Sequence, residues 1–192
     1  MNDGFKRSPY DPNLYVKNCN GDIIMVVLYV DDLIIIGSSL SQVYDFKKQL
    51  KKAFDITDLG LLHYFLGIHV WQEKDRIILS QPKYALDLLK KFKMENCKSA
   101  PTPIDAGTKL RSNSISEKFD GTLYRKLVGS LLYLTSMRPA IAYAVGMVSR
   151  FMSDPHLEHW NAAKRILRYI KGTYNLGLEY QNGGNVQLAG YT

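Results

Sequence analysis

Apolar side chains fill two short runs near the start of the chain, residues 23–30 and 33–36, and both runs are rich in β-branched residues. Because only Asp31 and Asp32 separate them, the pattern predicts a tight β-hairpin. Neither run alternates with polar residues, which is typical of strands that are covered on both faces. We therefore expect this hairpin to lie near the centre of its sheet.

The apolar spacing changes to three and four residues after this hairpin, which predicts a helix over residues 40–54. A second hairpin is expected over residues 63–72 and 76–80, followed by a short helix over residues 84–92. Helical spacing returns in the second half of the chain, at residues 124–137, 140–152 and 157–171. Strand patterns are expected at residues 14–17, 176–180 and 186–191.

The composition shifts towards Pro, Gly and Ser between residues 97 and 121, which is typical of a linker. We therefore expect four parts, at residues 1–100, 101–122, 123–175 and 176–192. Strands dominate the first part and helices the third, so the fold class is α+β.

The chain carries 25 Lys and Arg against 18 Asp and Glu, a net charge of +7 that favours a polyanionic partner. Its longest apolar run has eight residues, well short of the roughly 20 that a membrane-spanning helix needs. Cys19 and Cys97 show no metal-binding spacing, so we expect a reduced, intracellular and not secreted protein.

A basic stripe runs along the expected helix at residues 157–171, where Lys164, Arg168 and Lys171 are spaced i, i+4, i+7. Such a stripe can contact phosphates without reading base sequence. It can equally be the solvated face of a helix whose other face packs in the core, and both readings stay open. His156 and His159 have no ligand partners at a suitable spacing, and we expect them at the surface.

The adjacent carboxylates of the first hairpin point to metal chemistry. A turn selected for folding would favour Asn-Gly or Asp-Gly, whereas Asp31-Asp32 places two like charges side by side. Mg²⁺ prefers such hard oxygen ligands, and two ions about 4 Å apart support phosphoryl transfer. Neighbouring side chains point in different directions, so a third carboxylate is required.

None of the nearby acids is a convincing third ligand. Asp22 stands nine strand residues from Asp31, roughly 30 Å away. Asp11 is expected beyond a turn at that same far end, and Asp45 falls inside a helix. We expect the third ligand upstream of Met1.

Tyr29-Val30-Asp31-Asp32 resembles the YxDD motif of reverse transcriptases. Five longer segments also resemble, in the same order, the Pol polyprotein of copia-type LTR retrotransposons: "SPYDPNLYVK", "TDLGLLHYFLGI", "LSQPKYALDLLKKF", "YRKLVGSLLYLTSMRP" and "AYAVGMVSRFMSDPHLEHWNAAKRILRYIKGT". Two positions depart from the family pattern, His69 where an acid is usual and Ala140 where aspartate is usual.

The resemblance implies a polymerase palm, an antiparallel sheet with the YxDD hairpin plus helices, followed by a helical thumb or connection. It implies two Mg²⁺ ions, with Asp31 as the main ligand and Asp32 as a supporting one. Tyr29 and Val30 would lie beside the primer end and the incoming nucleotide. The partners would be an RNA template and DNA primer, or an RNA–DNA hybrid, and deoxynucleotides, in a cytoplasmic particle or the nucleus.

Three functions remain open from the sequence. The favoured one is a fragment of an RNA-directed DNA polymerase that is inactive alone, because the fingers and the first catalytic aspartate of the family are not in the chain. The alternative is a non-catalytic nucleic-acid-binding remnant. A two-metal nuclease is least favoured, because no further carboxylates or histidines gather near the pair. Oligomeric state stays open.

Overall fold

The computed structural model describes residues 4–19, 21–112 and 114–183. Contacts within the chain divide it into two compact units, Met1–Leu62 and His63–Thr192. This division differs from the expected boundary within residues 101–122. None of the helices in the described ranges is long and apolar enough to cross a lipid bilayer.

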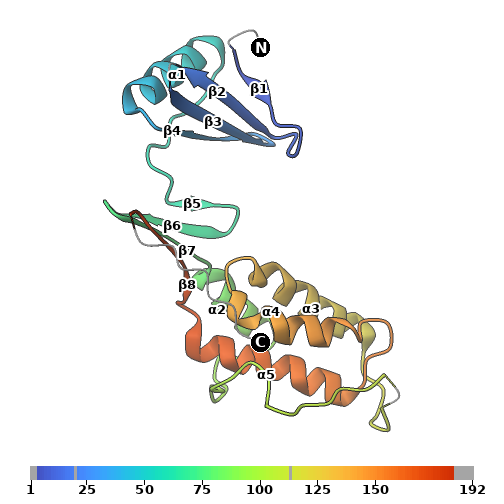
Figure 1. The fold of residues 1–192 in the computed structure, drawn as a ribbon. Coiled ribbons are helices and arrows are strands. Elements are labelled where there is room, and N and C mark those ends of the chain that lie inside the picture. The colour runs from blue at the N-terminus through green and yellow to red at the C-terminus, as the bar shows by residue number, and fades with distance from the viewer. Residues whose placement is uncertain (1–3, 20, 113, 184–192) are drawn as a thin grey trace. The chain divides into compact units, whose positions relative to one another are not determined.

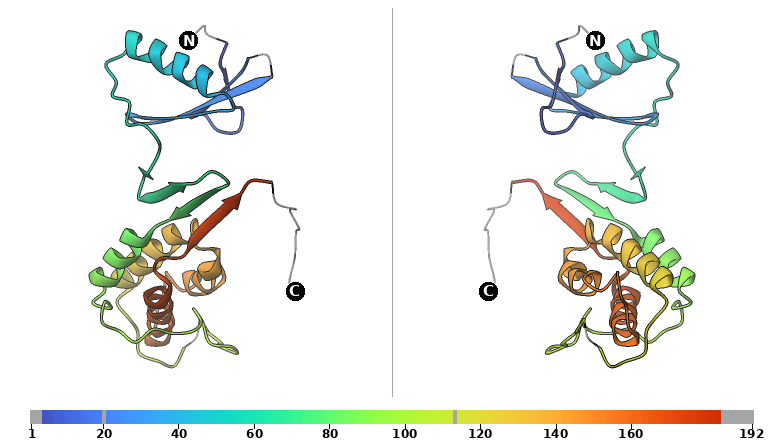
Figure 2. Two further views of the ribbon diagram at one scale, coloured as in Figure 1. Left: turned by 90° about the vertical axis from the view of Figure 1, so that its left-hand side faces the viewer. Right: turned by 90° about the vertical axis from the view of Figure 1, so that its right-hand side faces the viewer.

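The first unit is an antiparallel sheet with one helix (Figure 1). Its elements are β1 (Lys6–Arg7), β2 (Leu14–Cys19), β3 (Asp22–Tyr29), β4 (Asp32–Gly37) and α1 (Leu40–Ala53). The strands lie in the order β1-β2-β3-β4, and α1 packs against one face of the sheet (Figure 2). Gly37 permits this packing, because a Cβ atom there would lie 2.5 Å from Cγ2 of Val43.

The opposite face of this sheet corrects one expectation. Ile23 and Ile36 share that face and are 42% and 50% exposed, and β4 is the last strand in the sheet rather than a central one. The apolar runs predicted cover on both faces, but α1 is the one helix that the described residues of this unit provide. A run of apolar residues in a strand indicates that both faces of the strand can be buried. It does not identify the chain segment that covers each face.

The second unit combines a sheet with a group of four helices. The strands are β5 (Tyr64–Phe65), β6 (Ile68–Gln72), β7 (Arg76–Ser80) and β8 (Gly177–Gln181), paired antiparallel in that order. The helices are α2 (Pro82–Lys91), α3 (Gly121–Thr135), α4 (Pro139–Ser149) and α5 (Leu157–Thr173). The pairing of β7 with β8 joins the start and the end of this unit.

The four helices enclose a continuous apolar core. The side chains of Tyr124, Leu127, Leu131 and Ile166 are fully buried in it. The Tyr124 hydroxyl donates a 2.7 Å hydrogen bond to the Val148 carbonyl, so this buried polar group has a partner. The mixed α+β class and all five expected helices are confirmed, and so is the first hairpin, β3–β4. The second hairpin is present as β6–β7, but residues 63–72 do not form one strand, because β5 turns back and pairs with β6.

Residues 101–122 do not form a free linker. Ile104, Leu110 and Phe119 pack against the helical core, and the carboxylate of Asp120 caps α3 by accepting from the Thr122 and Leu123 amides at 2.8 and 3.1 Å. The polar composition indicated a loop correctly, but a few spaced apolar side chains suffice to attach it. The strand expected at residues 186–191 lies outside the described residues.

Candidate metal and nucleic-acid sites

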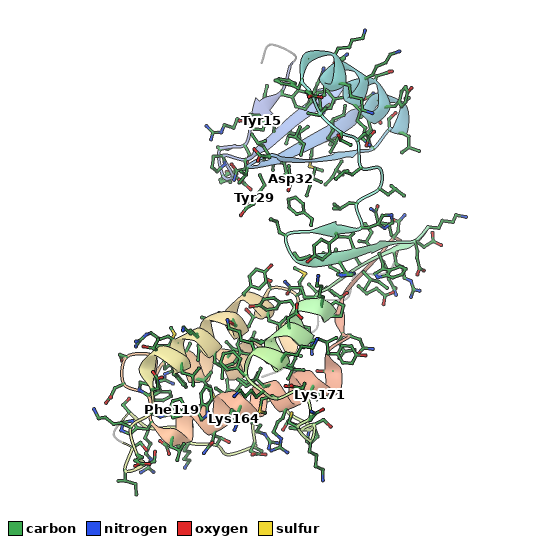
Figure 3. The ribbon with its side chains drawn as sticks, turned by 180° about the vertical axis from the view of Figure 1, so that it is seen from behind. Tyr15, Tyr29, Asp32, Phe119, Lys164 and Lys171 are labelled. Atoms are coloured by element: carbon green, nitrogen blue, oxygen red, sulfur yellow. The ribbon has the colours of Figure 1, made fainter. Side chains whose placement is uncertain are left out.

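The two carboxylates lie at a two-residue hairpin turn whose position corrects the sequence interpretation. Tyr29 pairs directly with Asp32, so Val30 and Asp31 form the turn and Asp32 begins β4. Directly opposed residues of an antiparallel pair project from the same face. Tyr29 and Asp32 therefore share a face, and Figure 3 shows them at one end of the sheet. Both carboxylates are exposed.

The backbone of this turn is strained. Val30 has a φ of 51°, and Asp31 does not share a positive φ. A positive φ at the first turn residue is typical of a type II′ turn, where glycine is preferred. A β-branched residue in this conformation is an outlier, and such strain costs on the order of 1–3 kcal/mol. The turn is thus held in an unfavourable conformation at the position of the carboxylates.

The donor set fits a hard divalent cation in part. Asp31 and Asp32 offer carboxylate oxygens on a short, well-defined turn, and Mg²⁺ is commonly bound by one or two carboxylates together with substrate phosphates. Within the described ranges, no three Asp, Glu, His or Cys side chains come close enough together to hold a metal ion. The pair is therefore a partial site.

Asp22 is committed to a structural role. Its Oδ1 accepts a 2.8 Å hydrogen bond from the Ser38 hydroxyl, and its Oδ2 accepts one of 3.0 Å from the Gln42 amide. It also pairs with Cys19 at the end of β3 away from the turn. The expectation that Asp22 is not the third ligand agrees with this geometry.

The position expected for Asp11 was wrong. Because β2 is antiparallel to β3, Leu14 pairs with Val27 and the Asn13 carbonyl accepts a 2.9 Å hydrogen bond from the Leu28 amide. Asp11 therefore lies at the same end of the sheet as the carboxylate turn. The antiparallel pairing of β2 with β3 indicates this position, because it places the start of β2 beside the end of β3. Even so, Asp11 does not complete a three-residue metal group with Asp31 and Asp32.

The basic stripe lies on α5, which is largely enclosed by its own unit. Lys164, Arg168 and Lys171 are each half-buried rather than open. Figure 3 shows Lys164 and Lys171 along this helix. Ala163, Leu167 and Ile170 are buried as expected, while Trp160 is half-buried and stacks on Phe119 with ring centroids 4.5 Å apart.

Residues 98–105, called here the crossing segment, run along the basic side of α5. Arg168 donates from Nε to the Lys98 carbonyl at 2.9 Å, and the Ala100 amide donates to the Arg168 carbonyl at 3.1 Å. Arg165 forms an ion pair with Asp105 at 2.6 Å and a hydrogen bond to Thr102. Arg168 and Arg165 thus hold this segment.

The histidines at the start of α5 are buried, so their expected surface position was wrong. His156 and His159 are 6% and 0% exposed. The His159 ring stacks on Phe151 at 3.9 Å, its Nδ1 accepts the His156 amide at 2.9 Å, and its Nε2 lies 3.1 Å from the Arg111 carbonyl. Since Nδ1 accepts, Nε2 carries the proton and donates the hydrogen bond to the Arg111 carbonyl. Burial holds the pKa of His159 below its ordinary value.

Comparison with known families identifies the class of protein. Residues 1–106 match the family model described as reverse transcriptase (RNA-dependent DNA polymerase). This match covers more than half of the chain and includes the carboxylate turn. The chain belongs to the reverse transcriptase family.

The curated relatives narrow the class to copia-type Pol polyproteins. The chain is 39% identical over 189 residues to the retrovirus-related Pol polyprotein from transposon RE1 of Arabidopsis thaliana, covering 98% of the chain and 13% of that relative. It is 38% identical over 192 residues to the corresponding polyprotein from transposon TNT 1-94 of Nicotiana tabacum, covering 95% of the chain and 14% of the relative.

A shorter relative is an uncharacterized mitochondrial protein of Arabidopsis thaliana, 38% identical over 167 residues, with 86% of the chain and 69% of the relative covered. No solved structure matches. The chain spans 13% and 14% of the two polyproteins. The activity of a complete polyprotein therefore does not follow for this chain.

Proposed function

We propose that this chain supplies the metal-binding turn of a copia-type reverse transcriptase. The observation that carries the proposal is a pair of exposed carboxylates on a two-residue turn within the family-matched region. Asp31 is the main metal ligand and Asp32 the supporting one. Tyr29, on the same face as Asp32, and Val30 lie beside the primer end and the incoming nucleotide.

Two bound Mg²⁺ ions would neutralise phosphate charge and favour attack of a primer 3′-hydroxyl on the α-phosphate of a deoxynucleotide. The contribution of the chain is to position the carboxylate oxygens on the two-residue turn between β3 and β4. The substrates are an RNA template with a DNA primer, or an RNA–DNA hybrid, and deoxynucleotides.

The functional division of the chain is part of the same proposal. Residues 1–100 supply part of the palm, and the helices at residues 123–175 supply the thumb or connection. Lys164 and Lys171 contact phosphates, since no ion pair within the described residues engages them. Arg168 has a reduced share in this contact because it already holds Lys98.

A non-catalytic nucleic-acid-binding role is the second candidate. It is favoured by the absence, within the described residues, of a third side chain that completes a metal group with Asp31 and Asp32. Phosphoryl transfer depends on positioning and charge neutralisation by metal ions, and two carboxylates supply fewer ligands than the two-ion site of the complete family needs. We therefore propose that the isolated 192-residue chain does not polymerise.

Metal binding tests the site directly. The parent chain is titrated with Mn²⁺, a spectroscopic substitute for Mg²⁺, and free Mn²⁺ is followed by electron paramagnetic resonance. We expect Asp31→Asn/Asp32→Asn to weaken binding at least tenfold and Asp45→Asn, an exposed aspartate of the same unit, to leave it unchanged. Equal binding by the parent and the double variant would remove Asp31 and Asp32 as metal ligands.

Primer extension on an RNA template separates the two candidate functions. We expect no extension by the parent chain in Mg²⁺. Extension that the Asp31→Asn/Asp32→Asn variant lacks would show that the chain is a complete catalyst, and it would overturn the proposal of inactivity.

A further inference from the structure

The loop between β1 and β2, residues 8–13, lies beside the carboxylate turn. Arg7 pairs with Tyr15 and Leu14 pairs with Val27, which fixes the loop at the end of the sheet where β3 meets β4. The Leu28 amide, one residue before Tyr29, donates to the Asn13 carbonyl. Figure 1 shows the loop and the turn at the same end of this sheet.

This loop has a defined conformation. The Ser8 hydroxyl accepts from the amides of Tyr10 and Asp11 at 3.2 and 3.3 Å, and Oδ1 of Asp11 accepts from the Asn13 amide at 2.9 Å. Arg7 donates from Nε to the Pro12 carbonyl at 2.7 Å. Pro12 and Pro9 also restrict the backbone. The loop therefore presents its side chains without a large ordering cost.

Tyr10 projects from this loop almost completely into solvent. Its side chain is 96% exposed, compared with 68% for Tyr44 on α1. Tyrosine has a large apolar ring, and aromatic rings held out in this way provide a stacking surface for nucleobases. Exposure of one ring is common on protein surfaces, so its position beside the carboxylate turn is the informative observation.

The charges around Tyr10 favour one orientation of a nucleic-acid strand. Lys6 on the adjacent strand β1 is exposed and would attract phosphates, and its pairing with Val16 places it on the same face of the sheet as Tyr29. Arg7 lies on the opposite face and already donates to the Pro12 carbonyl. The carboxylates of Asp11, Asp31 and Asp32 at the same end of the sheet repel phosphates that no metal ion neutralises. A strand would therefore place its backbone towards β1 and a base towards the Tyr10 ring.

We propose that Tyr10, together with Lys6, forms a contact for single-stranded nucleic acid beside the carboxylate turn, with Tyr10 stacking on a nucleobase. The inference rests on the proposed function, because the contact matters where a template or primer strand reaches the metal-binding turn. Stacking is tolerant of base identity, so the contact holds a strand in place without selecting its sequence.

Photocrosslinking of the full chain tests this contact. A fluorescent single-stranded DNA oligomer that contains 5-iodouracil is crosslinked, and the chain is digested with trypsin, which releases residues 8–17 as one peptide. We expect a crosslink in this peptide, assigned by fragmentation to Tyr10 rather than Tyr15. Tyr10→Ala should weaken oligomer binding by about fivefold or more, and Tyr10→Phe should retain it.

Two controls separate stacking from general effects. Tyr44→Ala removes another exposed ring of the same unit and should bind as the parent does. Lys6→Gln should reduce the salt dependence of binding while preserving the crosslink at Tyr10. Melting curves should be unchanged in Tyr10→Ala because the ring packs in no core.

Several outcomes would overturn the inference. They are binding by Tyr10→Ala equal to the parent, an equal loss in Tyr44→Ala, crosslinks elsewhere, and no oligomer binding at all. A change in the sedimentation of the chain alone on Tyr10→Ala would make the loop a protein contact instead. In each case the Mn²⁺ titration of Asp31 and Asp32 still tests the proposed function separately.

Discussion

The two compact units differ in how completely they remove their apolar side chains from water. In the second unit, the helices bury a continuous group that includes Leu127, Leu131 and Ile166 at 0% exposure. Among the described residues of the first unit, Ile24 and Val26 are the buried apolar ones. Small units with little buried surface are marginally stable. The carboxylate turn is therefore carried by the unit that has the smaller core.

Removing a core side chain from the second unit should give the largest effect. Leu131→Ala leaves a cavity among α3, α4 and α5, and we expect the free energy of unfolding to fall by about 2–5 kcal/mol. Chemical denaturation followed by circular dichroism measures the change. Ile36→Ala in the first unit is the control, with a change of about 0.5 kcal/mol, since surface substitutions seldom cost more. Equal losses in both variants would contradict the difference between the units.

Acid should destabilise the second unit through His159, which is buried next to His156, Glu158, Asp154 and the Arg111 carbonyl. The folded state lowers the pKa of His159 below its ordinary value of 6.5, mainly because of burial. Protons therefore bind preferentially to the unfolded chain. The contribution of His159 to stability is full above pH 6.5 and is lost progressively as the pH falls from 6.5 towards the lower pKa of the folded state.

A substitution isolates this contribution. His159→Gln should remove the part of the pH dependence below pH 6.5. It should also lower the free energy of unfolding by about 1–3 kcal/mol at pH 7.5, because the buried backbone amide of His156 is left without a partner. Urea titrations between pH 5 and pH 8 measure both effects. His63→Gln, an exposed histidine, is the matched control. A parent and a His159→Gln variant with the same pH slope would sink this account.

The smallest effect is expected at the strained turn of the first unit. Val30→Gly should stabilise this unit by about 1 kcal/mol, because glycine adopts a φ of 51° without a steric penalty. Hydrogen exchange of the β3 and β4 amides measures the gain. Val27→Gly, within a regular part of β3, should instead weaken protection. Faster exchange in Val30→Gly would show that the turn is not strained.

Much of the fold could be predicted because its signals are local. The apolar spacing around Val43, Phe46 and Leu50 depends on one helix, so the bounds of α1 were predicted to within a residue. The two apolar runs of the first hairpin likewise define their own strands. Asp31 and Asp32 were singled out because an adjacent pair of acids is unusual for a turn, and their role as metal ligands stays a prediction.

What was missed depends on contacts between distant residues. The turn is displaced by one residue because the pairing of Tyr29 with Asp32 is set across two strands. Asp11 was misplaced because its position follows from β2 running antiparallel to β3. The buried ring of His159 has hydrogen-bond partners in the backbone amide of His156 and the carbonyl of Arg111. The spacing of apolar residues along the chain gives no sign of either contact.

The crossing segment also limits where this chain can be shortened. The family match ends at residue 106, immediately after Asp105 has paired with Arg165 on α5. A fragment cut at that boundary would keep Ala85, Leu88 and Leu89 of α2 but lose the helices that bury them. The extent of the family match and the ability to fold alone therefore define different boundaries for a fragment of this protein, and an expression fragment should follow the second.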